Sequence, residues 1–229
     1  MRFYGIPFSP YQLAPALVPY FPRRRPVNLV DVGASLGSFT EAVEAHAGIR
    51  HAILIEPQPE NCRSLRTRFS EARFSVEECA VADVEGVSEM DLLNFHYASS
   101  LLEANPEFAS AFNEHLRVRE RIRVPVTTLD RLLSHDSWAG PIDLLKIDVQ
   151  GAELKVLNGG TASLARTRLV WVEVSFRPLY KGSATFPEVY NFMRQHDFSL
   201  IAMQEGYKGH SGELLQADAL FASASGHAR

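Results

Sequence analysis

A turn of small residues between an apolar run and a helix-like segment constrains the fold of this chain more than any other feature. The apolar run covers residues 28–32, and residues 39–47 carry apolar side chains at helical spacing. The small residues of the turn are Gly33, Ala34, Ser35 and Gly37. Where the backbone passes very close to a ligand, side chains must be small. The segment therefore predicts a strand, a ligand-binding turn and a helix, in that order.

Strand-like and helix-like segments alternate through most of the chain. Apolar strand-like runs stand at residues 28–32, 51–56, 74–81, 142–149 and 169–176. Helix-like segments stand at residues 39–47, 60–69, 128–133, 152–157 and 187–196. This order predicts parallel strands joined by helical crossovers, which is the pattern of a doubly wound α/β sheet.

The end of the chain departs from this alternation. Residues 198–204 and 214–222 are both strand-like, and a Gly-rich link at 205–213 joins them. The link is too short for a helical crossover, which two parallel neighbours would need. We therefore expect these two strands to form an antiparallel hairpin.

Length and composition fit one soluble domain. The chain has 229 residues, and we expect a domain at 27–223, an N-terminal lid or wrap at 1–26 and a frayed tail at 224–229. A hydrophobic content of 46% and a net charge of −4 suit a globular enzyme and give no general reason to expect nucleic-acid binding. Cys62 and Cys79 predict free thiols in a reducing compartment. Without a signal peptide or a membrane-length apolar run, we expect a cytoplasmic protein.

The middle of the chain has a different pattern. Residues 90–97 are strand-like, and residues 101–116 are expected to be helix or loop. Within residues 117–124 arginines alternate with mostly apolar residues, which predicts a strand with one charged face. We favour a solvated sheet edge, where charges discourage aggregation. The alternative is a basic strip that attracts an anionic substrate or carrier.

Two acids flank the turn and fit a nucleoside that carries an amino-acid end. Asp31 places an anion where a ligand amine would lie, and free amides at the helix start can bind a carboxylate. Glu56 ends the next strand, roughly 20 residues after Gly33, where an acid accepts hydrogen bonds from both ribose hydroxyls. Cys79 and Ala80 end the third strand-like run, and their small size suits a flat adenine ring.

The same turn allows other interpretations. Residues 33–37 also spell G-x-S-x-G, the nucleophile elbow of α/β-hydrolases. Such an elbow normally follows several strands, and only about 30 residues precede this one, so we reject it. An NAD-dependent oxidoreductase stays open, although the G-x-x-x-G spacing departs from the dinucleotide fingerprint. A non-catalytic nucleoside-binding module stays open as well.

Four segments in order carry a family resemblance. They are residues 30–37 (VDVGASLG), 55–59 (IEPQP), 124–130 (VPVTTLD) and 145–153 (LKIDVQGAE). Over approximately residues 28–205 the chain resembles the FkbM-family methyltransferases. Many class I methyltransferases share the first segment, whereas the last two are specific to this family. Residues 80–83 with Gly86, and Glu173, also match the family.

The resemblance implies a Rossmann-like α/β fold with a seven-stranded, mostly parallel sheet and a terminal antiparallel hairpin. It also implies S-adenosylmethionine at the carboxyl ends of the early strands and methylation of a hydroxyl. The acceptor would be a sugar, a glycan or a polyketide-type product, free or carrier-bound. The residues expected at the cofactor are Asp31, Gly33, Ala34, Ser35, Gly37, Phe39, Glu56, Pro57, Cys79, Ala80 and Asp148. One departure is Gln150, where the family commonly has Glu.

A general base near the acceptor would assist methyl transfer to a hydroxyl. Asp148 is the first candidate, because it ends the central apolar strand, where open α/β sheets place ligands. Glu173 on the next strand is the second candidate, and His96 is a third, because its ordinary pKa suits neutral pH. Lys146 lies in the strand of Asp148, where a lysine needs an acidic partner. Asp148 and Glu173 alone would give a metal ion few protein ligands, so we expect no metal. Binding of Mg²⁺ by these two carboxylates is the less favoured alternative.

A further set of residues is expected to meet the acceptor. Ser99 and Ser100 would line the mouth of the pocket by hydrogen bonding. Arg177 and Tyr180 lie in a polar segment after the fifth strand, which is either an acceptor loop or an ordinary surface connection. Gln150 and Glu153 complete this set.

Overall fold

The computed structural model describes residues 13–93, 100–103, 105, 118–134, 140–209 and 211–224, and its largest element is a seven-stranded sheet. Its strand order is β3-β2-β1-β7-β8-β10-β9. The strands are β1 (Val27–Val32), β2 (Ile49–Ile55), β3 (Phe74–Glu77), β7 (Ile142–Ile147), β8 (Thr167–Ser175), β9 (Phe198–Glu205) and β10 (Gln216–Ser223). The pairs from β3 through β8 are parallel, whereas β10 is antiparallel to both β8 and β9. The predicted mostly parallel sheet and its terminal hairpin are confirmed.

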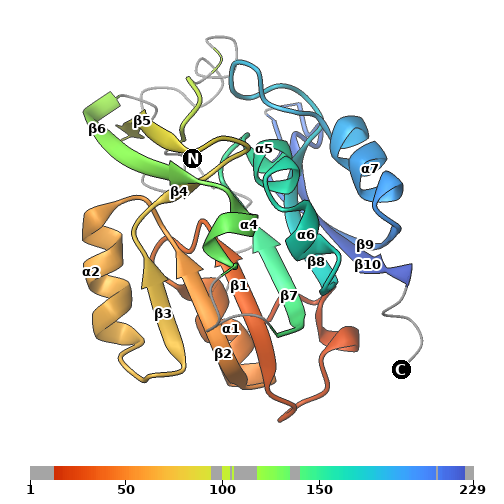
Figure 1. The fold of residues 1–229 in the computed structure, drawn as a ribbon. Helices are drawn as coiled ribbons and strands as arrows, with labels where there is room; N and C mark the ends of the chain where they lie inside the picture. The colour runs from red at the N-terminus through yellow and green to blue at the C-terminus, as the bar shows by residue number, and fades with distance from the viewer. Residues whose placement is uncertain are drawn as a thin grey trace.

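Helices cover both faces of this sheet (Figure 1). Every side chain of β1 is buried, as expected for a strand between two helical layers. One core cluster joins the sheet to α1 (Ser38–His46), α2 (Pro59–Arg68) and the short helix η1 (Val18–Tyr20) with its flanking residues. The other joins it to α4 (Leu129–Leu132), α5 (Glu153–Asn158), α6 (Thr161–Leu164) and α7 (Phe186–Gln195).

Local sequence signals explain where several helices begin. Pro59 and Pro187 stand in the first turns of α2 and α7, where a missing backbone N–H costs nothing. Thr185 and Glu188 form a reciprocal capping box at the start of α7. The helices predicted over residues 39–47, 60–69 and 187–196 each lie within one residue of those observed.

The described N-terminal residues, 13–26, pack against the sheet. Leu17 and Phe21 are fully buried in the cluster that contains α1. Arg168 on β8 donates a hydrogen bond of 3.0 Å to the backbone oxygen of Tyr20. This part of the expected lid or wrap therefore lies against the helical layer of α1. Residues 1–12 and 225–229 lie outside the described residues.

A second sheet was not predicted. Strands β4 (Ala80–Val81), β5 (Gly86–Leu93) and β6 (Val118–Thr127) form it in the order β4-β6-β5. It lies beyond the carboxyl ends of β1, β2 and β3 (Figure 1). The single strand predicted over residues 74–81 is wrong, because β3 pairs with β2 and β4 then pairs with β6 in the other sheet.

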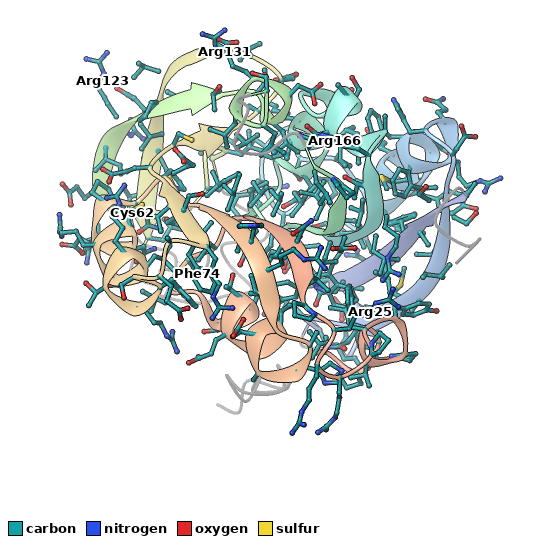
Figure 2. The ribbon with its side chains drawn as sticks, turned by 60° about the horizontal axis from the view of Figure 1, so that its bottom comes forward. Arg25, Cys62, Phe74, Arg123, Arg131 and Arg166 are labelled. Atoms are coloured by element: carbon teal, nitrogen blue, oxygen red, sulfur yellow. The ribbon has the colours of Figure 1, made fainter. Side chains whose placement is uncertain are left out.

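The arginine-rich strand is β6, and it is the middle strand of the second sheet rather than an edge. Its other face packs inward, with Val124 and Val126 in a small core cluster. Arg121 pairs with Asp91 at 2.6 Å and with Glu89 at 3.6 Å, so the charge of the strip is partly neutralised. Such exposed pairs stabilise a fold by only about 0–1 kcal/mol. Figure 2 shows Arg123 projecting away from the body of the molecule.

Two smaller predictions concern the thiols and the membrane. Cys62 and Cys79 are both free, as expected, and both are buried. Burial raises the pKa of the Cys79 thiol to about 11, which makes it a poor nucleophile. Within the described ranges, no helix is both long and apolar enough to cross a bilayer.

Candidate active site

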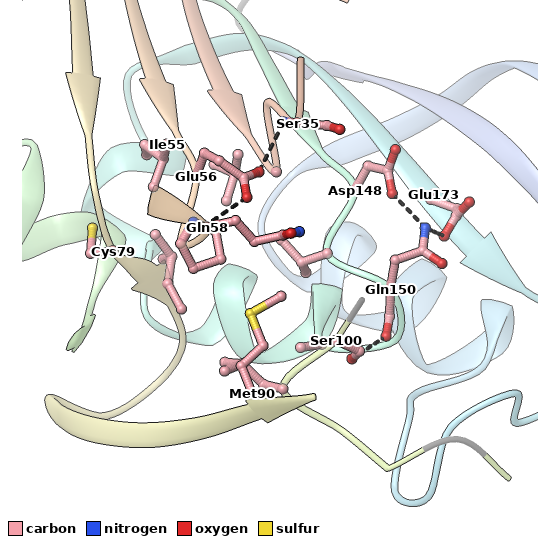
Figure 3. Close-up of a pocket in the computed structure, with 18 residues that line it drawn as sticks. Ser35, Ile55, Glu56, Gln58, Cys79, Met90, Ser100, Asp148, Gln150 and Glu173 are labelled. Carbon is pink, nitrogen blue, oxygen red and sulfur yellow. Dashed lines mark hydrogen bonds between the residues drawn. The ribbon is translucent and has the colours of Figure 1, made fainter. Parts of the chain in front are cut away.

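A cavity opens at the carboxyl ends of the parallel strands, where the second sheet covers them (Figure 3). The turn after β1 contributes Gly33 and Ser35, and the end of β2 contributes Glu56. Asp148 after β7 and Glu173 on β8 line the opposite side. Open α/β sheets bind ligands at this edge because the connecting loops diverge there.

The turn after β1 is held firmly by its neighbours. The backbone amides of Gly33 and Ala34 both donate to the carbonyl oxygen of Ile55, at 3.0 Å each. Gly33 has a φ of +78°, and a Cβ there would overlap the carbonyl oxygen of Asp148. The close approach of β7 therefore explains the glycine, whereas the sequence analysis attributed it to a ligand.

Glu56 connects the turn to the end of β2. Its carboxylate accepts hydrogen bonds from the backbone amides of Ser35 and Gln58, at 2.9 Å each, and from Asn61 Nδ2 at 3.2 Å. The residue is 3% exposed, and this burial raises the pKa of Glu56, although the amide bonds oppose the shift. The backbone amide of Ser35 is therefore already occupied. From the sequence we expected free amides near the helix start to bind a ligand carboxylate, and this amide cannot do so.

Ser35 lines the cavity and carries a second polar group, its hydroxyl. Its Oγ is buried and has no hydrogen-bond partner among the described residues. The residue has a φ of +49°, a left-handed conformation that costs a non-glycine residue free energy. An unpartnered buried hydroxyl is unfavourable unless a ligand or a water satisfies it. Ser35 therefore fits a bound molecule with a polar end.

Asp31 and Lys146 form a buried pair beneath the turn. The Asp31 side chain is fully buried and lies 3.2 Å from Lys146 Nζ, and it accepts a 2.7 Å hydrogen bond from Thr40. Lys146 Nζ also donates to the carbonyl oxygen of Gly33 at 2.6 Å and lies 3.7 Å from Asp148. The lysine ammonium thus occupies the place that the sequence analysis gave to a ligand amine, and Asp31 does not line the cavity.

The protonation state of Lys146 determines whether it can act as a base. Burial on its own lowers the pKa of Lys146, but the charges of Asp31 and Asp148 outweigh it and leave the pKa above its ordinary value. The ammonium therefore stays protonated and cannot serve as a base near neutral pH. Its geometry suits a structural link between the strand and the Gly33 turn.

The structure gathers most of the predicted cofactor residues around the cavity. Those that line it are Gly33, Ser35, Glu56, Pro57, Cys79, Ala80 and Asp148. Ala34, and Phe39 on α1, instead pack in the core, and a Cβ on Gly37 would overlap the ring of Phe69. Gln58, Met90 and Leu101 line the cavity and were missed. Gln58 follows the Glu56-Pro57 turn and could have been found, but Met90 comes from the second sheet.

The acidic side of the cavity is organised around Gln150. Its Nε2 donates to Asp148 Oδ1 at 2.8 Å and to Glu173 Oε2 at 3.0 Å. Gln216 Nε2 on β10 also donates to Glu173 Oε2, at 2.9 Å. Burial raises the pKa of Glu173 well above its ordinary value, and the charges of Asp148 and two further acids act in the same direction. A carboxyl group tuned upward in this way is typical of a general base.

The remaining predicted residues have varied places. Ser100 lines the cavity and donates a 2.7 Å hydrogen bond to the backbone oxygen of Gln150. Glu153 is buried inside the turn after β7, so it does not face the cavity, and burial raises its pKa to about 7. Tyr180 is buried and Arg177 is exposed, and neither is among the residues that line the cavity. His96 and Ser99 lie outside the described residues.

Comparison with known proteins identifies the family. The sequence profile of the methyltransferase FkbM domain matches residues 31–200. The chain belongs to the FkbM methyltransferase family. It is 30% identical over 209 residues to the 31-O-demethyl-FK506 methyltransferase FkbM of Streptomyces tacrolimicus, a match that covers 79% of this chain and 76% of that protein. It is 25% identical over 186 residues to the 2-O-methyltransferase NoeI of Sinorhizobium fredii (strain NBRC 101917 / NGR234), covering 76% and 73%.

A solved structure agrees with the fold. The crystal structure of methyltransferase FkbM from Methylobacillus flagellatus KT matches with a TM-score of 0.52 at 15% identity. The match covers 86% of this chain but only 43% of that one, so this chain spans less than half of that protein's length. The Rossmann-like fold predicted for this FkbM-family chain is confirmed.

Asp218 is a further acid of this FkbM-family chain that was not predicted, and it lies behind the cavity lining rather than in it. It lies on β10 opposite Glu173 in the antiparallel register, beyond the residues that the family profile matches. Burial and the nearby charge of Asp148 raise the pKa of Asp218 to about 7, against the effect of Lys146. The alternation of residues along β10 could have suggested which face of the sheet Asp218 lies on, but only the strand register places it beside Glu173.

Among the described residues, no group of three or more acids, histidines or cysteines has metal-binding geometry.

Replacing Asp218 with asparagine should stabilise the protein above pH 7. A carboxyl group whose pKa rises on folding binds its proton more tightly in the folded state, so wild-type stability falls as the pH rises from about 4 to about 7. Asp218 is only half-buried, and solvent screening reduces the effect. We therefore expect Asp218→Asn to raise the free energy of unfolding by about 1–3 kcal/mol at pH 8, and by almost nothing at pH 4. Urea unfolding at both pH values measures it. The exposed Asp83→Asn variant is the control, and an equal gain at both pH values would contradict the prediction.

Proposed function

We propose that this chain is an S-adenosylmethionine-dependent O-methyltransferase that acts on a hydroxyl of a sugar, glycan or polyketide-type product. One observation carries the proposal. A single cavity has a nucleoside-type side, formed by the Gly33 turn and Glu56, and a facing acidic side formed by Asp148 and Glu173. Methyl transfer requires a cofactor and an acceptor to meet in line, and this arrangement brings both kinds of group to one space.

The cofactor side fits the chemistry of S-adenosylmethionine. Glu56 Oε2 accepts only one hydrogen bond from the described residues, so it can still accept one from a ribose hydroxyl. Ser35 Oγ has no partner among the described residues, so a polar end of the ligand would satisfy it. Glu56, Asp148 and Glu173 give the described lining a negative character that suits a sulfonium cation. The bound cofactor would supply an electrophilic methyl group.

The acceptor side fits a hydroxyl that must lose a proton. Glu173 Oε2 is held by two amide groups, while no hydrogen bond from the described residues reaches Oε1. We assign Oε1 the role of accepting the proton as the hydroxyl oxygen attacks the methyl group. The names of the two relatives, a 31-O-demethyl-FK506 methyltransferase and a 2-O-methyltransferase, support transfer to oxygen.

Replacing Glu56 with alanine should weaken binding of S-adenosylmethionine by about 10- to 100-fold. A hydrogen bond to a charged group is worth about 1.5–3 kcal/mol, and the variant also leaves the amides of Ser35 and Gln58 without their acceptor. Calorimetric titration of the full chain measures the affinity. Glu60→Ala is the matched control, because Glu60 is exposed in the first turn of α2 and pairs only loosely with Arg63.

A thermal-shift comparison separates this proposal from its alternatives. S-adenosylmethionine and S-adenosylhomocysteine at 100 times their dissociation constants should each stabilise the fold by about 2.7 kcal/mol. Stabilisation by NAD alone would favour an oxidoreductase. Cofactor binding without methyl transfer to any hydroxyl in a panel of sugars and macrolides would favour a binding module. Unchanged affinity in Glu56→Ala would overturn the placement of the nucleoside.

A further inference from the structure

The side chain of Gln150 sits between two carboxylates that would otherwise repel each other. Its single Nε2 atom carries two hydrogens and donates at 2.8 Å to Asp148 and at 3.0 Å to Glu173 (Figure 3). Two acids so close together usually share a proton or a cation. Here one neutral amide reaches both.

Neighbouring groups fix the direction of this amide. Tyr180 donates its hydroxyl hydrogen to Gln150 Oε1 at 3.0 Å, which leaves Nε2 as the end that faces the acids. The two ends of an amide differ only in their hydrogen-bond partners, and here Tyr180 and the two acids agree on one orientation. Ser100 holds the backbone of Gln150 by donating to its carbonyl oxygen at 2.7 Å.

The backbone holds Gln150 in a costly conformation. Its φ is +57°, in the left-handed region that a non-glycine residue seldom adopts. Glu153 maintains the turn by accepting hydrogen bonds from the backbone amides of Val149, at 3.1 Å, and Gly151, at 3.0 Å. Strain of this kind persists where the surrounding structure imposes it, and it gathers at functional sites.

Several acidic groups surround the Gln150 amide, so a neutral donor at this position reduces their mutual repulsion. Asp148, Glu173, Glu153 and Asp218 act on one another from the turn after β7, β8, α5 and β10. The charge of Lys146 acts against this effect at Glu173 and Asp218, but its ammonium already contacts Asp31 and the Gly33 carbonyl oxygen. A glutamate at position 150 would add a further negative charge to this cluster and remove both hydrogen-bond donors.

We propose that Gln150 is a positioning residue that joins Asp148 and Glu173 in place of a shared proton or a divalent cation. By holding Glu173 Oε2, it leaves Oε1 as the oxygen that can accept the proton of the acceptor hydroxyl. The role in proton acceptance rests on the proposed methyl transfer. The bridging itself is a property of the protein alone and can be measured without a substrate.

The test is a carboxyl titration by carbon-13 NMR of glutamate-labelled protein, with the Glu173 signal assigned by its loss in Glu173→Gln. In Gln150→Met the carboxylate loses a donor, so the apparent pKa of Glu173 should rise by about one unit. Tyr180→Phe keeps the amide but frees its orientation, and should give a smaller rise. Gln195→Met, at an exposed position on α7, should leave the titration unchanged.

A second variant tests whether the Gln150 amide takes the place of a divalent cation between the two acids. Gln150→Glu places three carboxylates together, which is a set that divalent cations bind. Millimolar Mn²⁺ should raise the melting temperature of Gln150→Glu and not that of the wild type. A Glu173 titration that is unchanged in both Gln150→Met and Tyr180→Phe would overturn the proposal, as would an equal Mn²⁺ effect on wild type and Gln150→Glu. Failure of S-adenosylmethionine to bind would overturn the proposed function and leave these two results standing.

Discussion

Replacing Lys146 with methionine should destabilise the protein by about 3–5 kcal/mol, because the change leaves a buried carboxylate without its cation. Asp31 is fully buried, and the Lys146 side chain is 8% exposed, so water cannot replace the lost charge. The carbonyl oxygen of Gly33 loses its donor in the same variant. The free energy of unfolding from urea or guanidinium titration at pH 7 measures the effect.

Two further variants separate the charge from the packing. Asp31→Asn combined with Lys146→Met removes both charges, so it should recover a large part of the loss. Lys155→Met changes an exposed lysine on α5 and should alter stability by less than about 0.5 kcal/mol. A double variant no more stable than Lys146→Met would show that the ion pair is not the source of the effect.

This buried pair links the stability of the sheet to the shape of the turn at Gly33. Lys146 on β7 reaches Asp31 at the end of β1 and the carbonyl oxygen that begins the turn. Because Asp31 and Lys146 are register partners on adjacent parallel strands, the pair also fixes how β1 and β7 meet. The core and the site therefore share one ion pair, and a loss there should loosen both.

Much of the large sheet could be predicted because its signals are local. The apolar run before Gly33 and the helix after it reflect burial on both faces of β1 and the period of α1. The hairpin of β9 and β10 followed from a link too short for a helix. Periodicity and turn length act over a few residues, so a single sequence reveals them.

The second sheet could not be predicted because its pairings are long-range. β4 has only two residues, and its Ala80 pairs with Val126 of β6, 46 positions later (126 − 80). Two residues carry no measurable alternation. The run that looked like one strand over residues 74–81 is therefore divided between two sheets by partners that lie far along the chain.

The candidate site also contains some residues that could be predicted from the sequence and others that could not. Glu56 could be predicted from its distance along the chain after Gly33, since a strand and a helix of ordinary length separate them. The partner of Asp31 could not, because the sequence does not show that Lys146 lies beside it across two strands. Gln150 and Asp218 act through side chains from other elements, and such networks arise only when tertiary structure forms.

Replacing Glu173 with glutamine should lower kcat for methyl transfer by about 10²–10⁴-fold, the usual contribution of a positioned general base. Burial and the neighbouring acids raise the pKa of Glu173, and a base works only when deprotonated. Activity of the wild type should therefore rise with pH through this elevated pKa, above the range of an ordinary glutamate. The acid limb of the kcat profile should disappear in the variant.

The same variant separates catalysis from folding and cofactor binding. Glutamine keeps the shape of Glu173 and removes a charge that other acids repel, so the melting temperature should stay level or rise. Affinity for S-adenosylmethionine should stay within about threefold, a change of less than 1 kcal/mol. Glu60→Gln, exposed on α2, is the control for a lost carboxylate elsewhere. A variant that retains wild-type kcat and its acid limb would move the base to another group, with Asp148 the next to test because it also faces the cavity.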